Sequence, residues 1–506
     1  MNTFMNNLAV NDSLKKTENG AVAYSSTLSG VYDLFALGGS YRNRSINECI
    51  ELFRSAYVEN PTYAIKCLFY LRDVIGGQGE RRFFRICYEW LINNDIEMAR
   101  RNLRSIPNFG RWDDLIYICE GSLLEETGFE IVHEQLAKDM GTCESGKNGI
   151  SLCAKWVPSE NASSAETKRV AGKLREFLGI SHKSYRKILS RLRSTINIVE
   201  KLMSQNRWEE IEFDKIPSRA GLIYRNAFAR REILQQKYKA FLEDDSKKMN
   251  SATLYPYEIV NQVLKNERFT MFSNLKNDEV DVTERKALNK AWENLPDYFE
   301  GREESMIAVV DTSGSMTYGQ PMPLSVAISL GIYCGEKNSG DFANKFITFS
   351  SRPKMVTIEG NDIVEKVISI ADKSIIDDTN LEKVFDLLFC TAQQSNFKDI
   401  PKTVIVISDM EINQAESNID YGRDPSYQVK SLMRNIRETW EASGVPMPRL
   451  VYWNVNARND TILDVGENVS LVSGCSPIIF QMVMGGKTGW DLCLEKILSE
   501  RYKEIY

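Results

Sequence analysis

The segment Met306–Met316 (MIAVVDTSGSM) constrains the fold more than any other part of the sequence. Its apolar first half is rich in β-branched side chains, which is typical of a strand buried on both faces of a parallel sheet. The run ends at Asp311, Ser313 and Ser315 follow on a polar loop, and a helical pattern resumes at Pro323. This order of strand, loop and helix predicts an open α/β sheet, in which ligands bind where the strands end.

Two later loops offer further oxygen donors. Thr403–Ser408 (TVIVIS) predicts a second buried strand that runs into Asp409, and Thr379 lies on a loop just before a helical pattern. Mg²⁺ prefers six oxygen ligands, more than one loop supplies, and keeps waters where the protein offers too few. The candidate ligands of Mg²⁺ or another divalent cation are therefore Asp311, Ser313, Ser315, Thr379 and Asp409.

Two other interpretations of this loop exist. Asp311 and Ser313 can simply cap a turn and the next helix. A phosphatase with a nucleophilic aspartate would need a second aspartate where Ser313 stands, so that interpretation is disfavoured. The series D-x-S-x-S, then threonine, then aspartate resembles the metal-ion-dependent adhesion site (MIDAS) of von Willebrand factor A (vWA) domains.

Length and composition limit the remaining choices. A chain of 506 residues is too long for a single core, so two or more domains are expected. Only two histidines and no G-x-x-x-x-G-K-[ST] motif occur, which argues against Ser-His or Cys-His catalysis, histidine-rich metal sites and a P-loop. No apolar run approaches the ~20 residues of a membrane helix. The ten cysteines form no C-x-x-C motif, and we expect reduced thiols and a cytoplasmic location.

Charge is unevenly distributed along the chain. Residues 301–506 carry 20 Lys+Arg against 28 Asp+Glu, whereas Lys168–Arg193 carries nine basic residues and one acidic residue. Within this basic segment the apolar positions recur at helical spacing, which predicts two amphipathic helices. Such a cationic surface attracts phosphate and releases counterions from nucleic acid. The alternative is a solvated helix face that balances the acidic half.

The region before residue 300 has helical periodicity throughout. Short corners join the predicted helices, among them RDVIGGQGER (Arg72–Arg81) and IPNFGRWDD (Ile106–Asp114). The three glycines of the first corner allow a phosphate-cradle interpretation, but no strand precedes them, so a tight corner between helices is preferred. Helix pairs without strands suggest an α-solenoid of the HEAT or armadillo kind.

The last 200 residues alternate strand and helix patterns. Six strands are expected in a mostly parallel sheet, with a local antiparallel hairpin: Met306–Val310, Lys345–Phe349, Met355–Ile358, Thr403–Ser408, Leu450–Asn454 and Val469–Ser473. The expected helices are Leu324–Glu336, Ile363–Ala371, Leu381–Ser395, Gln428–Ser443 and Trp490–Tyr502.

A helical array followed by a vWA domain resembles the TROVE architecture of Ro ribonucleoproteins. An uncharacterised family with the same layout is more similar still, through the stretches RDVIGGQGER, GRWDDL, AKWVPSE, YRKILSRLR, FDKIPS, LYPYEIV, DTSGSM and GCSP. The polar N-terminal sequence MNTFMNNLAVNDSLKK predicts a loose arm, which we expect over residues 1–40. The resemblance, which begins at about Tyr41, implies an all-α HEAT-like domain over 41–300 that can close into a ring, and a Rossmann-like α/β vWA domain over 301–506. In Ro proteins the helices close into a ring through the vWA domain, and basic residues bind small structured RNAs and the single-stranded ends of misfolded RNAs.

These expectations lead to three hypotheses of function. The first is a non-catalytic, Ro-like RNA-binding protein whose expected RNA contacts are Arg169, Lys173, His182, Lys183, Tyr185, Arg186, Lys187, Arg191 and Arg193, with Tyr185 or a nearby aromatic offering a face for base stacking. The second is an interaction scaffold in which the Mg²⁺ accepts a carboxylate from a protein partner. The third is a metal-dependent nuclease, for which Asp377 and Asp378 are the available additional groups.

Overall fold

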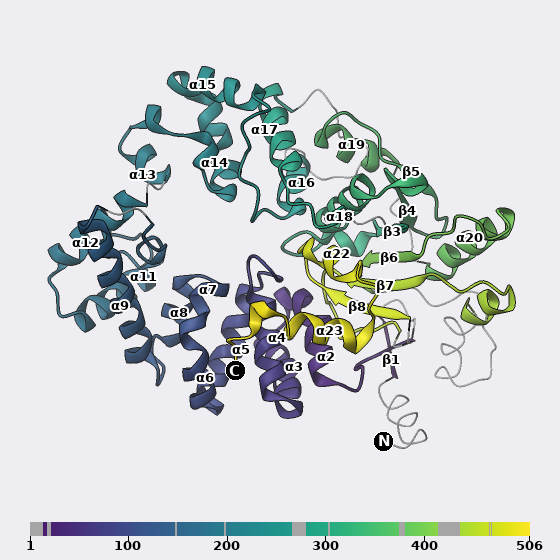
Figure 1. Ribbon diagram of the computed structural model, residues 1–506, viewed down its shortest axis with the longest axis horizontal. Coiled ribbons are helices and arrows are strands. Elements are labelled where there is room, and N and C mark those ends of the chain that lie inside the picture. Colours follow the sequence, from purple (N-terminus) through teal and green to yellow (C-terminus); the bar gives the residue numbers. More distant parts are fainter. Residues whose placement is uncertain are drawn as a thin grey trace.

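The computed structural model describes residues 14–17, 22–146, 149–196, 199–265, 280–301, 304–373, 380–412, 436–464, 466 and 468–506. It consists of a helical N-terminal half and a C-terminal α/β half (Figure 1). Among the described residues, no helix combines the length and the apolar character needed to span a lipid bilayer.

The α/β half contains one six-stranded sheet. Its strands are β3 (Met306–Asp311), β4 (Lys345–Phe349), β5 (Met355–Thr357), β6 (Thr403–Ser408), β7 (Arg449–Asn454) and β8 (Val469–Ser473). They lie in the order β5-β4-β3-β6-β7-β8, and only β5 runs antiparallel, as the partner of β4. The prediction of six strands, mostly parallel, with one local hairpin is therefore confirmed, and the bounds differ by one residue at most.

Three helices lie between these strands in the sequence: α18 (Pro323–Lys337), α19 (Ile363–Lys373) and α20 (Leu381–Gln394). Two more, α22 (Ile478–Val483) and α23 (Gly489–Ile497), follow β8. The helix expected over Gln428–Ser443 is described only from residue 436, where residues 436–442 are helical. The single closing helix expected over Trp490–Tyr502 is instead α23 followed by a short 3-10 turn at Glu500–Tyr502.

The helical half is a succession of helices, many of them joined by short corners. Its helices are α2 (Gly30–Leu37), α3 (Ile46–Glu59), α4 (Pro61–Arg72), α5 (Arg81–Asn94), α6 (Ile96–Asn102), α7 (Ile106–Phe109), α8 (Trp112–Cys119), α9 (Glu125–Glu144), α10 (Cys153–Trp156), α11 (Ala165–Phe177), α12 (His182–Thr195), α13 (Val199–Ser204), α14 (Ser218–Arg230), α15 (Glu232–Glu243), α16 (Pro256–Lys265) and α17 (Val282–Glu293). Local sequence sets many of the boundaries. For example, Ser45 and Glu48 form a capping box at the start of α3, and Pro61 occupies the first turn of α4.

The N-terminal segment corrects one expectation. Residues 1–40 do not form a loose arm throughout, because α2 is buried along almost its whole length and packs against α3, α4 and β8. Its sequence, GVYDLFAL, is apolar nearly all round, which is the pattern of a helix enclosed on every side. A short hairpin of β1 (Leu14–Lys16) and β2 (Val22–Tyr24) precedes it and pairs with Ile462 through Tyr24.

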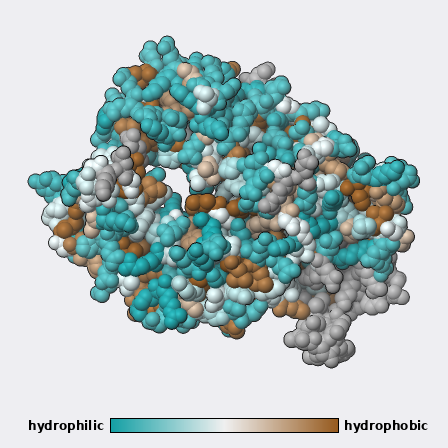
Figure 2. All heavy atoms as spheres, viewed as in Figure 1, coloured by the Kyte–Doolittle hydropathy of each residue, from teal (hydrophilic) through white to brown (hydrophobic). Residues whose placement is uncertain are grey.

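The two halves contact each other at both ends of the helical array. At its start, the Gly39 amide donates to Ser473 Oγ (3.0 Å) beside strand β8. At its end, Arg285 of α17 forms an ion pair with Asp362 (2.6 Å), just before α19, and α16 packs against α18. The chain therefore closes on itself, and Figure 2 shows an opening through the molecule that in Figure 1 lies between α14 and α7, beside α16.

The glycine-rich corner Arg72–Arg81 lies between α4 and α5, with no strand before it, as the preferred interpretation predicted. The Tyr255 hydroxyl, just before α16, donates to the carbonyl oxygen of Gln78 (3.1 Å) in this corner. Gly79 has a φ of +69°, and a Cβ there would lie 2.3 Å from the Tyr255 hydroxyl. The corner is thus a packing contact between two distant parts of the helical half.

The C-terminal residues pack into the helical half rather than onto the sheet. Lys66 Nζ of α4 donates to the carbonyl oxygen of Tyr502 (2.5 Å), and the Tyr502 ring stacks on Phe109 at a centroid distance of 5.4 Å. The Tyr506 N–H donates to Asn102 Oδ1 (2.9 Å), and Asn102 Nδ2 donates to the carbonyl oxygen of Tyr506 (2.8 Å).

Candidate metal centre and cationic helical surface

The candidate metal centre lies where strands β3 and β6 end side by side. Because these strands are parallel neighbours in register, with Val310 opposite Ile407, Asp311 and Asp409 emerge at the same edge of the sheet. Asp311 Oδ1 accepts a hydrogen bond from the Ser313 amide (2.9 Å), which fixes the tight turn of the loop. The hydroxyl oxygens of Ser313 and Ser315 lie 2.9 Å apart. The structure thus brings four of the five expected ligands together at one edge.

Thr379, the fifth expected ligand, lies outside the described residues, as do Asp377 and Asp378. These three residues remain predictions for the metal centre and for the nuclease hypothesis.

The two carboxylates of this centre are buried close to each other. Burial raises the pKa of Asp311, although the Ser408 and Ser313 donors oppose the shift. Burial and the negative charge of Asp311 together raise the pKa of Asp409 to about 7. Asp409 Oδ2 is buried and has no hydrogen-bond partner among the described residues. A bound cation would supply the positive charge that this pair lacks.

The chemistry of the donors fits a hard divalent cation. Aspartate and serine oxygens are the ligand types that Mg²⁺ binds in proteins, with waters completing the coordination. In the described part of the chain, no group of three or more His, Cys, Asp or Glu side chains is arranged to hold a metal. The centre therefore suits Mg²⁺ better than zinc, which prefers nitrogen and sulfur ligands.

Sequence reasoning missed the role of Ser408. Its hydroxyl donates to Asp311 Oδ2 (2.5 Å), so it holds the carboxylate from the neighbouring strand. The signal was available, because Ser408 is the polar residue that ends an otherwise apolar strand directly before Asp409.

The second candidate site is the cationic segment of α11 and α12. Helix α12 contains no acidic residue, and its buried face consists of Tyr185, Leu189 and Leu192. The side chains of Lys183, Arg186 and Lys187 are exposed and form no ion pair with any described residue. This part of α12 therefore presents three uncompensated positive charges to solvent.

The other expected RNA contacts on this surface have acidic partners. Arg169 and Lys173 both bind Glu120, with 3.0 Å between Arg169 Nη2 and Glu120 Oε2. Arg191 pairs with Glu144 at 3.2 Å. His182 Nδ1 and Glu160 Oε1 are 2.7 Å apart. The positive charge of these residues is partly neutralised within the protein.

The structure changes the expectation for Tyr185 and Arg193, because both side chains bind groups within the protein. Tyr185 is only 1% exposed, and its hydroxyl donates to the carbonyl oxygen of Pro158 (2.7 Å), so the expectation of a stacking face is wrong. Arg193 donates to the carbonyl oxygens of Ala154 and Val157, both at 2.8 Å. Both side chains are therefore bound to main-chain carbonyl groups of α10 or of the two residues that follow it.

Comparisons with known proteins identify relatives of both halves. The family described as "Domain of unknown function (DUF2828)" matches residues 17–133 and 163–300, and "Domain of unknown function (DUF7788)" matches residues 305–503. The "Uncharacterized protein L728" of Acanthamoeba polyphaga mimivirus is 30% identical over 519 residues, which cover 94% of this chain and 85% of that protein.

A solved structure, the crystal structure of the Deinococcus radiodurans RO (RSR) protein, is similar over 90% of this chain and 93% of that chain, with a TM-score of 0.39 and 13% identity. The family match covers most of the helical half, and the viral relative extends over both halves. The chain therefore belongs to the DUF2828 family.

Proposed function

We propose that this protein binds RNA non-catalytically, through the exposed face of α12, and that its α/β half is a vWA-like domain that holds Mg²⁺. The observation that carries the proposal is the group of three unpaired cations, Lys183, Arg186 and Lys187, on a helix without acidic residues. Positive side chains on a helix of this kind bind phosphates without reading the base sequence.

The anchoring of α12 within the helical half supports the same proposal. The base of α12 is anchored by Tyr185 and Arg193, which are bound to main-chain carbonyl groups. The exposed cations are therefore presented from a rigid helix, and less conformational entropy is lost when they bind a phosphate backbone. Small structured RNAs and single-stranded RNA ends are the ligands that this surface would take.

In the α/β half, Asp311, Ser313, Ser315 and Asp409 would hold the Mg²⁺, with Thr379 as a further ligand. When bound, the cation neutralises two buried carboxylates and fixes the loops at the edge of the sheet.

The test uses two double variants of equal charge change. Arg186→Glu/Lys187→Glu reverses two charges on α12, and Lys247→Glu/Lys248→Glu does the same at an exposed turn elsewhere in the helical half. RNA affinity is measured by fluorescence anisotropy between about 50 and 200 mM salt. We expect the α12 variant to bind RNA weakly and to lose about 0.7 of the logarithmic salt slope for each phosphate contact removed. Equal RNA binding by the parent and both variants would refute the proposal.

A second candidate function is an interaction scaffold in which the metal accepts a carboxylate from a protein partner. Asp409 Oδ2, buried without a hydrogen-bond partner among the described residues, favours it, because a cation bound to this oxygen could accept a further carboxylate as a ligand. Under this proposal Asp311→Ala abolishes the capture of a protein partner and leaves RNA binding intact. Loss of RNA binding with the partner retained would favour the first function instead.

A further inference from the structure

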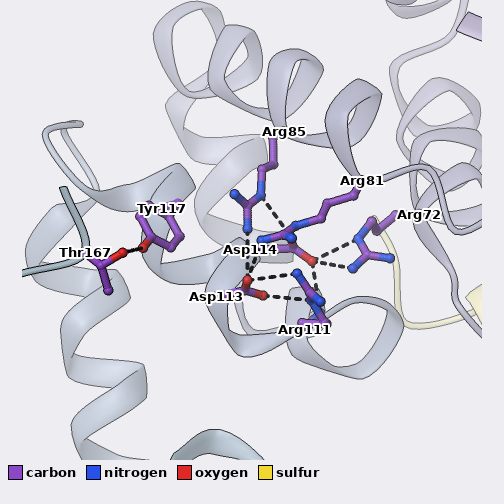
Figure 3. A network of polar contacts seen from close by, with 8 residues as sticks. All are labelled: Arg72, Arg81, Arg85, Arg111, Asp113, Asp114, Tyr117 and Thr167. Carbon is purple, nitrogen blue, oxygen red and sulfur yellow. Dashed lines mark hydrogen bonds and ion pairs between the residues drawn. The ribbon is translucent and has the colours of Figure 1, made fainter. Parts of the chain in front are cut away.

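Four guanidinium groups converge on two neighbouring carboxylates at the start of α8 (Figure 3). The guanidinium groups come from the motif RDVIGGQGER, from helix α5 and from the motif GRWDDL. A third motif, AKWVPSE, lies beside them. The residues are Arg72, Arg81, Arg85 and Arg111, with Asp113 and Asp114. We call this set the arginine cluster.

Asp114 is saturated with donors inside the cluster. Its Oδ2 accepts from Arg72 Nε (2.9 Å) and Nη2 (2.6 Å), and from the Arg111 amide (3.0 Å). Its Oδ1 accepts from Arg85 Nε (2.8 Å) and Arg81 Nε (3.1 Å). Although burial alone would raise the pKa of Asp114, the surrounding guanidinium groups keep it below its usual range. Asp114 thus anchors the cluster and has no acceptor capacity left.

Asp113 binds the remaining charges incompletely. It accepts two hydrogen bonds from Arg111, both of 3.0 Å, and one from Arg81 Nη2. The Arg85 Nη2 atom lies 3.5 Å from Asp113 Oδ2 and is buried without a hydrogen-bond partner among the described residues. Four cations share two anions, so two positive charges remain in excess, and no other described carboxylate forms an ion pair with these arginines.

The outer side of the cluster is accessible and carries an aromatic ring. Arg81 is 39% exposed and Arg111 is 25% exposed. The Arg111 guanidinium lies over the Trp156 ring at 4.0 Å from its centroid, and Lys155 Nζ lies 5.3 Å from the same centroid. Guanidinium groups bind phosphate oxygens through charge-assisted hydrogen bonds, and the Trp156 ring holds the Arg111 guanidinium in place at this surface.

The cluster lies at the corner between α7 and α8, against the start of α5.

We propose that Arg81, Arg85 and Arg111, assisted by Lys155, bind one phosphate group, carried either by an RNA strand or by a free phosphate ion. Only the source of the phosphate rests on the proposed function. The site is separate from the exposed face of α12, so the two can fail independently.

The first experiment uses the unaltered protein. Phenylglyoxal modifies accessible arginines, and mass spectrometry reports the rate at each one. Millimolar inorganic phosphate, or a 5′-phosphorylated hexauridylate, is expected to slow modification of Arg81 and Arg111, while Arg104, an exposed arginine paired with Glu134, reacts unchanged. Chloride at matched ionic strength is the control for general screening.

Protection by both probes supports the proposal as stated. Protection by inorganic phosphate without any RNA binding would leave a site for free phosphate and would refute RNA as the function. RNA binding without protection of Arg81 and Arg111 by either probe would overturn the arginine-cluster site and leave the function standing.

The second experiment compares Arg111→Gln with Arg104→Gln in the full chain. Loss of one forked contact is expected to weaken binding of the phosphorylated hexauridylate about tenfold in Arg111→Gln only. Circular dichroism confirms the fold of each variant. Equal affinities of the folded variants would overturn the proposal.

Discussion

The Ser408 hydroxyl donates a 2.5 Å hydrogen bond to Asp311 Oδ2, although the two residues are 97 positions apart in the sequence. This contact joins the ends of strands β6 and β3 and positions one carboxylate beside another, that of Asp409. Burial and the charge of Asp311 raise the pKa of Asp409 to about 7, and a cation bound between the two carboxylates would relieve their repulsion.

We therefore expect Mg²⁺ to stabilise the protein. At 100 times its dissociation constant, a ligand that binds only the folded state adds about 2.7 kcal/mol to the free energy of unfolding. Thermal unfolding with and without Mg²⁺ measures this, and Asp311→Asn should abolish the response. Asp341→Asn, at an exposed carboxylate of the same half, should retain it. An equal response of both variants would contradict the assignment of Asp311 as a ligand.

Replacing Asp114 by asparagine should destabilise the fold strongly. The change removes the charge that pairs with the guanidinium groups of Arg72, Arg81 and Arg85, and breaking a buried ion pair of this kind costs about 3–5 kcal/mol. Urea denaturation monitored by circular dichroism measures the loss. The exposed Asp245→Asn serves as control and should change the free energy of unfolding by less than about 0.5 kcal/mol. Similar stabilities of the two variants would show that the cluster is not an anchor.

Tyr185→Phe separates anchoring from RNA contact. The variant loses the hydrogen bond to Pro158 and should lower the free energy of unfolding by about 1 kcal/mol. RNA affinity should stay unchanged, because the ring is buried. A variant with normal stability and weakened RNA binding would restore the stacking role that the structure contradicts.

Glu120 should make stability depend on pH in the acid range. Its hydrogen bonds from Arg169 and Lys173 lower its pKa from 4.5 to about 2. A lowered pKa means that this stabilisation is complete above about pH 4.5 and is lost as the pH falls from there toward about 2. The difference in unfolding midpoint between the parent and Glu120→Gln should therefore be largest near neutral pH and shrink below about pH 4.5. A constant difference would exclude the ion pairs as its cause.

Much of the α/β half could be predicted because its signals are local. Apolar, β-branched runs such as Thr403–Ser408 fix the strands, and the polar residues that follow them fix the edge where Asp311 and Asp409 meet. Register between parallel strands then brings these residues together without further information.

The functional faces of α12 could not be assigned in the same way. Helical periodicity separates Lys183 and Lys187 from Leu189, but it does not say that Tyr185 would reach a carbonyl group 27 residues earlier. Nor does composition show that Glu120, from another helix, neutralises Arg169 and Lys173. Both facts depend on tertiary contacts that the sequence pattern does not encode.

The arginine cluster was missed for the same reason. Most of its residues belong to two separate corners, Arg72–Arg81 and Ile106–Asp114, and only packing brings them to one carboxylate pair. A buried aspartate pair next to arginines from several motifs is the signal that could have indicated it.

The packing of Tyr502 and Tyr506 into the first helices has a consequence for unfolding. Residues at the end of the α/β half complete the core around Phe109 and Asn102, so neither half buries its own surface alone. Calorimetry should accordingly record one cooperative transition, and the helical half, if expressed separately, should melt without a sharp midpoint.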